Sequence, residues 1–171
     1  EEIIIQGAEE LGPALRAWAS DPLRVDELIE LLLRYSLIQR TPEVKSLSIH
    51  RLVQAVLKDG MDRDIQRLWA ERAIRAVNSA FPDVELQNWE RCQRCLPHVQ
   101  ICATYMEEYA FAFPEAARLL NEAASYLLAH ARYEEAEWLL LRALAVRQQV
   151  LKGDHPDTAR TLNDLGVLYK K

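Results

Sequence analysis

The sequence predicts a mainly α-helical protein in which a small module with one short β-hairpin precedes an array of antiparallel helical hairpins. Half of the 171 residues are hydrophobic and only five are glycine, which is the balance of a soluble, mostly helical chain that can bury a core. Strand-like patterning is confined to two short segments between residues 37 and 50. Beyond residue 60 the apolar residues recur at helical spacing, and a pattern repeats after 42 residues, from Leu120 to Leu162.

The first sixty residues predict a small domain built around that hairpin. Apolar spacing indicates three helices, over residues 11–18, 21–35 and 50–58. The second begins at Asp21-Pro22, an N-cap residue followed by an early helical proline, and the third ends at Gly60, where glycine is favoured. Alternating residues predict two small strands, over 37–40 and 47–50. Two helices, a hairpin and a helix make a winged-helix-like domain over residues 1–60.

Everything after Gly60 is expected to be helical. The predicted helices cover residues 64–81, 88–109, 114–130, 133–151 and 157–171. Prolines at 82, 114 and 156 mark the breaks, because the residue before a proline disfavours helical geometry. This spacing predicts a helical connector over residues 61–112 and stacked helical repeats over residues 113–171.

The repeat places small and large side chains in matching positions. Leu120-Asn121 and Leu162-Asn163 stand at the same offset from Ala124 and Gly166. We expect the small residues Ala124 and Gly166 to let a neighbouring helix come close.

The repeat resembles a known family. The matching segments are Arg132-Tyr133-Glu134-Glu135-Ala136-Glu137, Arg142-Ala143-Leu144-Ala145-Val146-Arg147, Gly153-Asp154-His155-Pro156-Asp157-Thr158-Ala159 and Leu162-Asn163-Asp164-Leu165-Gly166. Residues 114–171 are similar to the long tetratricopeptide (TPR) repeat of kinesin light chains and of many bacterial signalling ATPases. Two positions depart from that pattern: Ala131 stands where the family has glycine, and Leu127 where it has tyrosine.

The N-terminal part carries a second resemblance. Residues 35–38 and 47–54 are similar to the winged-helix segment that follows the nucleotide-binding core of STAND-class (NB-ARC-like) signalling ATPases. The resemblance implies that His50 lies near bound ADP in the full-length protein and senses the nucleotide state. The alternative is that His50 only bonds to the backbone at its helix start. Arg51 replaces an acidic residue common in the plant branch.

The overall charge disfavours nucleic acid as a partner. The chain has a net charge of −5 and a pI near 5.4, whereas phosphate binding requires clustered basic residues. In the helix over 50–58, Leu52, Val53, Val56 and Leu57 call for burial rather than for DNA contact. Without a spanning apolar run or a secretion signal, we expect a cytoplasmic chain with no membrane partner. Its ends suggest a piece of a longer protein.

The sequence predicts neither a catalytic nor a metal site. Cys92, Cys95, His98 and Cys102 are expected to pack within one helix interrupted by Pro97, rather than to bind zinc. The four tryptophans are interpreted as core anchors, and the pairs Glu107-Glu108 and Glu134-Glu135 as solvated surface. No Walker-type glycine loop occurs, so ADP or ATP is expected only in a separate nucleotide-binding domain.

A ligand is expected on the first helices of the hairpins, which line the concave side of such arrays. The residues predicted to point into that groove are Arg118, Asn121, Glu122, Ser125, Arg160, Asn163 and Asp164. Their mixed polar character suits a protein or peptide ligand, although a plain solvated face remains the alternative.

Together these features predict the sensor and relay portion of a bacterial STAND-type ATPase, not an enzyme in itself. Its expected partners are a protein or peptide ligand, its own nucleotide-binding domain and, through the apolar C-terminal helix, another copy of itself. A winged-helix transcriptional regulator with a TPR sensor and a passive TPR scaffold are the alternatives.

Overall fold

A computed structural model describes residues 1–19, 21–44, 46–151 and 154–170. Gly153 and Lys171, which belong to the predicted repeat and to its last helix, lie outside the described residues. The contacts divide the chain into two compact units, Glu1–Ala76 and Val77–Lys171. The division falls within one helix, α5 (Arg63–Ala80).

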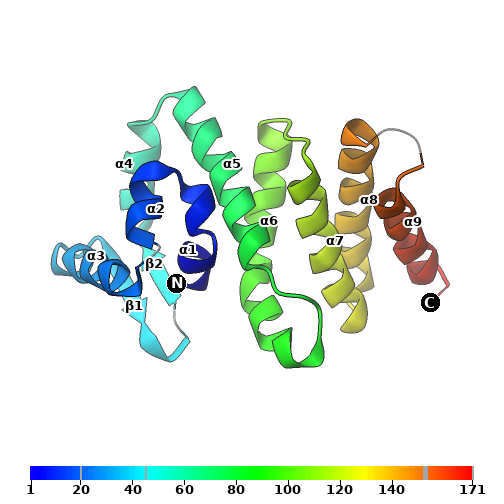
Figure 1. The fold of residues 1–171 in the computed structure, drawn as a ribbon, viewed down its shortest axis with the longest axis horizontal. Coiled ribbons are helices and arrows are strands. Elements are labelled where there is room, and N and C mark those ends of the chain that lie inside the picture. Colours follow the sequence, from blue (N-terminus) through cyan, green and yellow to red (C-terminus); the bar gives the residue numbers. More distant parts are fainter. Residues whose placement is uncertain (20, 45, 152–153, 171) are drawn as a thin grey trace. The chain divides into compact units, whose positions relative to one another are not determined.

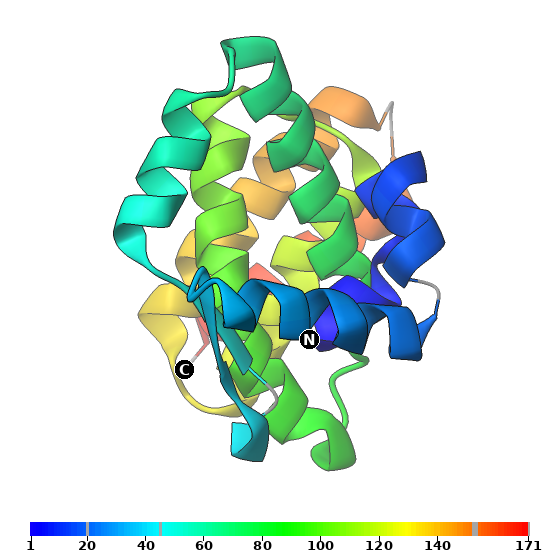
Figure 2. The same ribbon diagram turned by 90° about the vertical axis from the view of Figure 1, so that its left-hand side faces the viewer.

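The first unit contains the expected hairpin among helices (Figure 1). Its elements are α1 (Glu2–Gln6), α2 (Pro13–Ala19), α3 (Pro22–Arg34), β1 (Ile38–Thr41), β2 (Ser46–Ile49), α4 (Arg51–Asp59) and the start of α5. The strands pair antiparallel, with Ile38 opposite Ile49 and Thr41 opposite Ser46. Figure 2 shows α3 beside this hairpin, and a small core of Val25, Ile29 and Ile38 joins the two.

One helix of this unit was not predicted. The segment that forms α1 is rich in isoleucine, whose branched side chain favours strands. The structure places Gly7, directly after α1, against α5, where a Cβ on Gly7 would lie 2.5 Å from the Cβ of Ala76. Arg40 fixes the chain start by donating to the carboxylate of Glu1 at 2.8 Å and pairing with Asp26 at 2.9 Å. Tertiary contacts therefore override the local preference.

The helix α4 is less buried than expected. Leu52 and Val56 are 70% and 72% exposed, and Leu57 is 52% exposed. With Val53 they line an open apolar cavity of about 520 Å³ beside α3 and the hairpin. The expectation that this face is packed into a core is wrong, because no described element of the first unit covers it.

The second unit consists of helices laid side by side (Figure 1). They are the end of α5, α6 (Trp89–Glu108), α7 (Pro114–Ala129), α8 (Tyr133–Val150) and α9 (Pro156–Leu168). Contacts are most extensive between α7 and α8, followed by α8 with α9 and α6 with α7. This order confirms a mainly helical protein with antiparallel hairpins of TPR type. Helix α6 continues through Pro97, which sequence reasoning took as an interruption.

The small residues at the equivalent positions of the two repeat copies differ in burial. Ala124 is fully buried between helices, as predicted. Gly166 is exposed, and a Cβ built there would meet no atom within 4 Å, so its expected close helix contact is absent among the described residues. Between α7 and α8, Ala131 adopts φ 56°, the left-handed conformation that favours the glycine expected here from the resemblance.

Within the described residues, no helix combines the length and the apolar character that crossing a membrane requires.

Candidate functional site

Most of the predicted groove residues form joints between helices instead of lining an open groove. Asn121 on α7 is fully buried. Its side-chain oxygen accepts hydrogen bonds from Thr161 and Arg147, both at 2.9 Å, and its amide nitrogen donates to Asp164 at 3.1 Å. Asn121 therefore connects α7 to α8 and α9, and sequence reasoning was wrong to place it on an open face. The α9 helix that covers it supplies two of its partners.

Arg147 is the charged member of this polar joint. It is 4% exposed and donates to the side chains of Asn121 and Thr161 and to the backbone carbonyl of Asp157. Burial lowers the pKa of its guanidinium, while the charge of Asp157 opposes that shift. A buried polar network of this kind holds its members in one arrangement when every group is satisfied.

Two further predicted residues of α7, Glu122 and Arg118, also connect helices, whereas Ser125 bonds within its own helix. Glu122 is buried and pairs with Arg160 of α9 at 2.9 Å. Arg118 donates to the side-chain oxygen of Asn78 on α5 at 2.9 Å. Ser125 donates to the backbone carbonyl of Asn121 at 3.0 Å, which is a bond within α7.

Asn163 stands apart from this set because it is exposed and because its side chain, among the described residues, forms no hydrogen bond or ion pair. The polar face therefore contains at least two cross-links between α7 and α9, and the exposed members of the predicted set are Arg118, Arg160 and Asn163. Whether any of the seven residues contacts a ligand stays a prediction.

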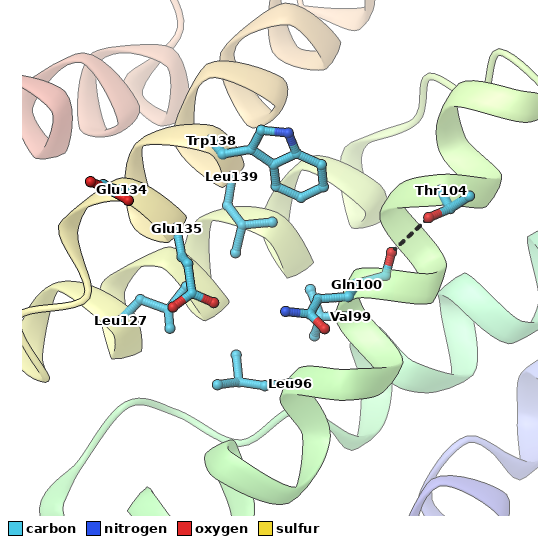
Figure 3. A pocket seen from close by; sticks show the side chains of 9 residues that line it. All are labelled: Leu96, Val99, Gln100, Thr104, Leu127, Glu134, Glu135, Trp138 and Leu139. Carbon is cyan, nitrogen blue, oxygen red and sulfur yellow. Dashed lines mark hydrogen bonds between the residues drawn. The ribbon is translucent and has the colours of Figure 1, made fainter.

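A cavity lies on another face of the second unit, between α6 and α8 (Figure 3). Its volume is about 430 Å³, within the range of roughly 300–1,000 Å³ that ligand sites occupy. The lining residues are Leu96, Val99, Gln100 and Thr104 of α6, Leu127 of α7, and Glu134, Glu135, Trp138 and Leu139 of α8. We call this cavity the α6–α8 groove.

Trp138 is the most conspicuous side chain of the groove. Its interpretation as a core anchor is wrong: it is 43% exposed, and its ring lies on the groove side of α8 (Figure 3). The core face of α8 is formed by other residues, including Ala136, Leu140 and Ala143. The guanidinium of Arg142 lies 3.7 Å from the centroid of the indole, which orients the ring by a cation–π contact.

Polar groups are few in this groove and come from both helices. The side-chain amide of Gln100 and the carboxylate of Glu135 point into the space, whereas Glu134 lies at its rim (Figure 3). Glu135 is held by Arg132 through two hydrogen bonds of 2.7 Å each. The hydroxyl of Thr104 donates to the backbone carbonyl of Gln100 at 3.2 Å, so it belongs to the helix.

Arg142 bridges α8 to α6. It donates to the backbone carbonyl of Ala103 at 3.3 Å and forms an ion pair with Glu107. A second cavity of about 250 Å³, with lining residues from α6, α7 and α8, is lined by Arg142. Arg142 thus lines this second cavity and lies over the ring of Trp138, which lines the α6–α8 groove.

His50 has a local structural role in the first unit. It is the N-cap of α4, and its Nδ1 accepts a hydrogen bond from the backbone N–H of Leu52 at 3.2 Å. This contact is the one that the purely structural interpretation requires. Because Nδ1 accepts this hydrogen bond, a contact of His50 with a nucleotide would have to use Nε2.

The cysteines of α6 are packed in the core. Cys92, Cys95 and Cys102 are buried free thiols. Burial raises the pKa of Cys102 to about 12 and also raises that of Cys92, so neither thiol is poised as a nucleophile. The described residues include no group of three His, Cys, Asp or Glu side chains placed to hold a metal ion.

Comparison with known proteins supports the repeat and a relation to an NLR-like protein. Residues 115–171 match the tetratricopeptide repeat family, and residues 1–66 match a domain of unknown function (DUF7779). A nucleotide-binding leucine-rich repeat (NLR)-like protein of Hyaloscypha variabilis is 30% identical over 150 residues, which is 82% of this chain. The chain spans 14% of the length of that relative. No solved structure matches the chain. The chain therefore contains a TPR region and is similar to part of an NLR-like protein.

Proposed function

We propose that this chain is the sensor and relay part of a STAND-type signalling ATPase. Its TPR-type helices bind a protein or peptide ligand and pass that event to a nucleotide-binding domain outside this sequence, where ADP or ATP is held. The chain itself performs no catalysis in this proposal. The NLR-like relative, whose name includes nucleotide binding, and the repeat over residues 115–171 support it.

The observation that carries the proposal is the α6–α8 groove. Its walls come from α6 and from α8, the second helix of the α7–α8 pair, so a ligand in the groove contacts both. A ligand shifts a conformational equilibrium only by its differential affinity for the two states. A ligand that contacts both helices has a different affinity for two states of the protein if the distance between α6 and α8 differs between those states.

The first unit would act as the winged-helix-like relay. In this role His50 senses the nucleotide through Nε2, while Nδ1 continues to cap α4. Replacing His50 by asparagine retains a side-chain acceptor at the N-cap, whereas alanine removes it. In the full-length protein, nucleotide sensing predicts that both variants change basal nucleotide exchange. If only His50→Ala changes it, capping is the whole role of His50.

The binding half of the proposal is tested with the 171-residue chain and a random-peptide library displayed on phage. We expect selection to enrich peptides that compete with one another for one site on the second unit. Failure to enrich any such peptide would remove the ligand-binding role.

The relay half is tested in the full-length protein that contains this chain. A selected peptide should change the release rate of a fluorescent ADP analogue by about fivefold or more, since allosteric couplings typically amount to 1–3 kcal/mol. If saturating peptide leaves the release rate unchanged, the chain is a passive scaffold and the relay role is refuted. The same measurement with a scrambled peptide controls for nonspecific effects.

A further inference from the structure

We infer that the α6–α8 groove accepts a peptide segment of a partner protein in which a large apolar side chain stands next to a lysine or arginine. The inference rests on the proposed ligand-binding function and adds the chemistry of the ligand. It follows from the apolar walls of the groove, the charge of its lining and the position of the side-chain amide of Gln100.

The walls of the groove favour an apolar anchor. Leu96, Val99, Leu127 and Leu139 are buried at its base, and Trp138 remains 43% exposed beside them. Covering exposed apolar surface is favourable in proportion to the area removed from water. Tryptophans in such positions are enriched among the residues that dominate binding energy.

The charge of the lining favours a cation next to that anchor. Both ionisable side chains that line the groove are carboxylates, Glu134 and Glu135. Arg132 neutralises Glu135 through its two hydrogen bonds. Glu134 has neither an ion pair nor a hydrogen bond among the residues that the structure describes, so the rim keeps one unpaired negative charge. A lysine or arginine complements it, whereas an acidic neighbour would be repelled.

The side-chain amide of Gln100 favours a peptide over a purely apolar ligand. It points into the space from α6, facing the carboxylate side of α8 (Figure 3). A glutamine amide both donates and accepts, which matches the N–H and C=O groups of a peptide backbone. The anchor, the cation and the backbone therefore each have a counterpart in the groove.

The inference is tested by selecting the phage-displayed peptide library against the full chain and against two matched pairs of variants. Trp138→Ala removes the anchor site, and Leu141→Ala on the same helix is its control, because Leu141 is 48% exposed and does not line the groove. Glu134→Lys reverses the rim charge, and Glu108→Lys makes the same change at an exposed position that does not line the groove. Circular dichroism verifies that each variant is folded.

We expect peptides with an aromatic or large aliphatic residue beside a basic residue. Trp138→Ala should weaken their binding about thirtyfold or more, as for a dominant anchor, and Leu141→Ala should leave it unchanged. Glu134→Lys should weaken the binding of the same peptides about three- to tenfold, and this loss of affinity should become smaller at high salt. The variant should select peptides in which an acidic residue stands beside the apolar anchor. Glu108→Lys should preserve the original selection.

Several outcomes would overturn the inference. If selected peptides bind Trp138→Ala and wild type equally, or if Glu134→Lys keeps selecting basic peptides, the ligand lies elsewhere or has another chemistry, while the proposed function stands. If no peptide is enriched, both fail. If sedimentation shows a dimer that Trp138→Ala dissociates, the groove holds a second copy of the chain.

Discussion

Replacing Asn121 by alanine tests whether the polar face of α7 is a structural joint. The change removes hydrogen bonds to Thr161, Arg147 and Asp164. A neutral bond contributes about 1 kcal/mol and a bond to a charged group about 1.5–3 kcal/mol, and Asp164 is half-exposed and counts less. The expected cost is about 3–5 kcal/mol in the unfolding free energy of the second unit. Asn163→Ala, at the equivalent exposed position of the next copy, should stay within about 0.5 kcal/mol.

The measurement must separate the two units, because a chain with two compact parts does not unfold in one transition. Hydrogen exchange of α7 and α9 amides along a urea titration reports the second unit alone. A double-mutant cycle of Asn121→Ala with Thr161→Val should give a coupling of about 0.5–3 kcal/mol. The reasoning is refuted if Asn121→Ala costs less than about 1 kcal/mol, or no more than Asn163→Ala.

Three further predictions concern other positions. Ala131→Gly should stabilise the α7–α8 hairpin by about 1 kcal/mol in thermal unfolding, because it relieves a left-handed φ of 56°, and an unchanged midpoint would contradict this. Gly7→Ala should destabilise the first unit by about 1–3 kcal/mol in urea unfolding, because its Cβ would lie 2.5 Å from the Cβ of Ala76 and 2.6 Å from the backbone oxygen of Ile3, and equal stability of variant and wild type would count against it. Cys102 has a folded pKa of about 12 against an ordinary 9.0, so its contribution to stability is complete below pH 9 and declines as the pH rises towards 12. Urea unfolding across that range should show the decline in wild type and a smaller one in Cys102→Ala.

The sequence could predict the elements because their signals are local. The proline at the start of α3 follows an N-cap whose carboxylate accepts from Leu23 in the structure, and the two strands lie within one residue of their expected bounds. Helical spacing likewise located α7 and α8. These signals depend on neighbours within a few residues, so they survive without knowledge of tertiary contacts.

Which side of each element faces solvent could not be predicted in the same way. Asn121 and Asn163 stand at equivalent positions of the repeat, but one is fully buried and the other is exposed. The difference arises from α9, which supplies Thr161 and Asp164 to Asn121. A repeat pattern gives the position of a residue within its own helix, whereas burial depends on the helix packed against it.

The groove was missed for a related reason. Apolar residues occupy more than one face of α8, so spacing alone did not distinguish Trp138 from the core residues Leu140 and Ala143. The usable signal was the i, i+4 pair of Trp138 with Arg142, because a basic residue one turn from a tryptophan favours a ring at the surface with a cation over it. The structure has this arrangement, with the guanidinium 3.7 Å from the ring centroid.

The groove and the polar joint share α8 but use different residues on it. Arg147 belongs to the joint with α7 and α9, whereas Trp138 lines the groove with α6. A ligand can therefore occupy the groove without breaking any hydrogen bond of the polar joint. In the proposed relay, a shift of α8 that the ligand causes passes to α9 through this joint. Closely packed helices transmit such shifts as rigid elements instead of absorbing them. In the proposed relay, one helix thus holds the array together with some residues and contacts the ligand with others.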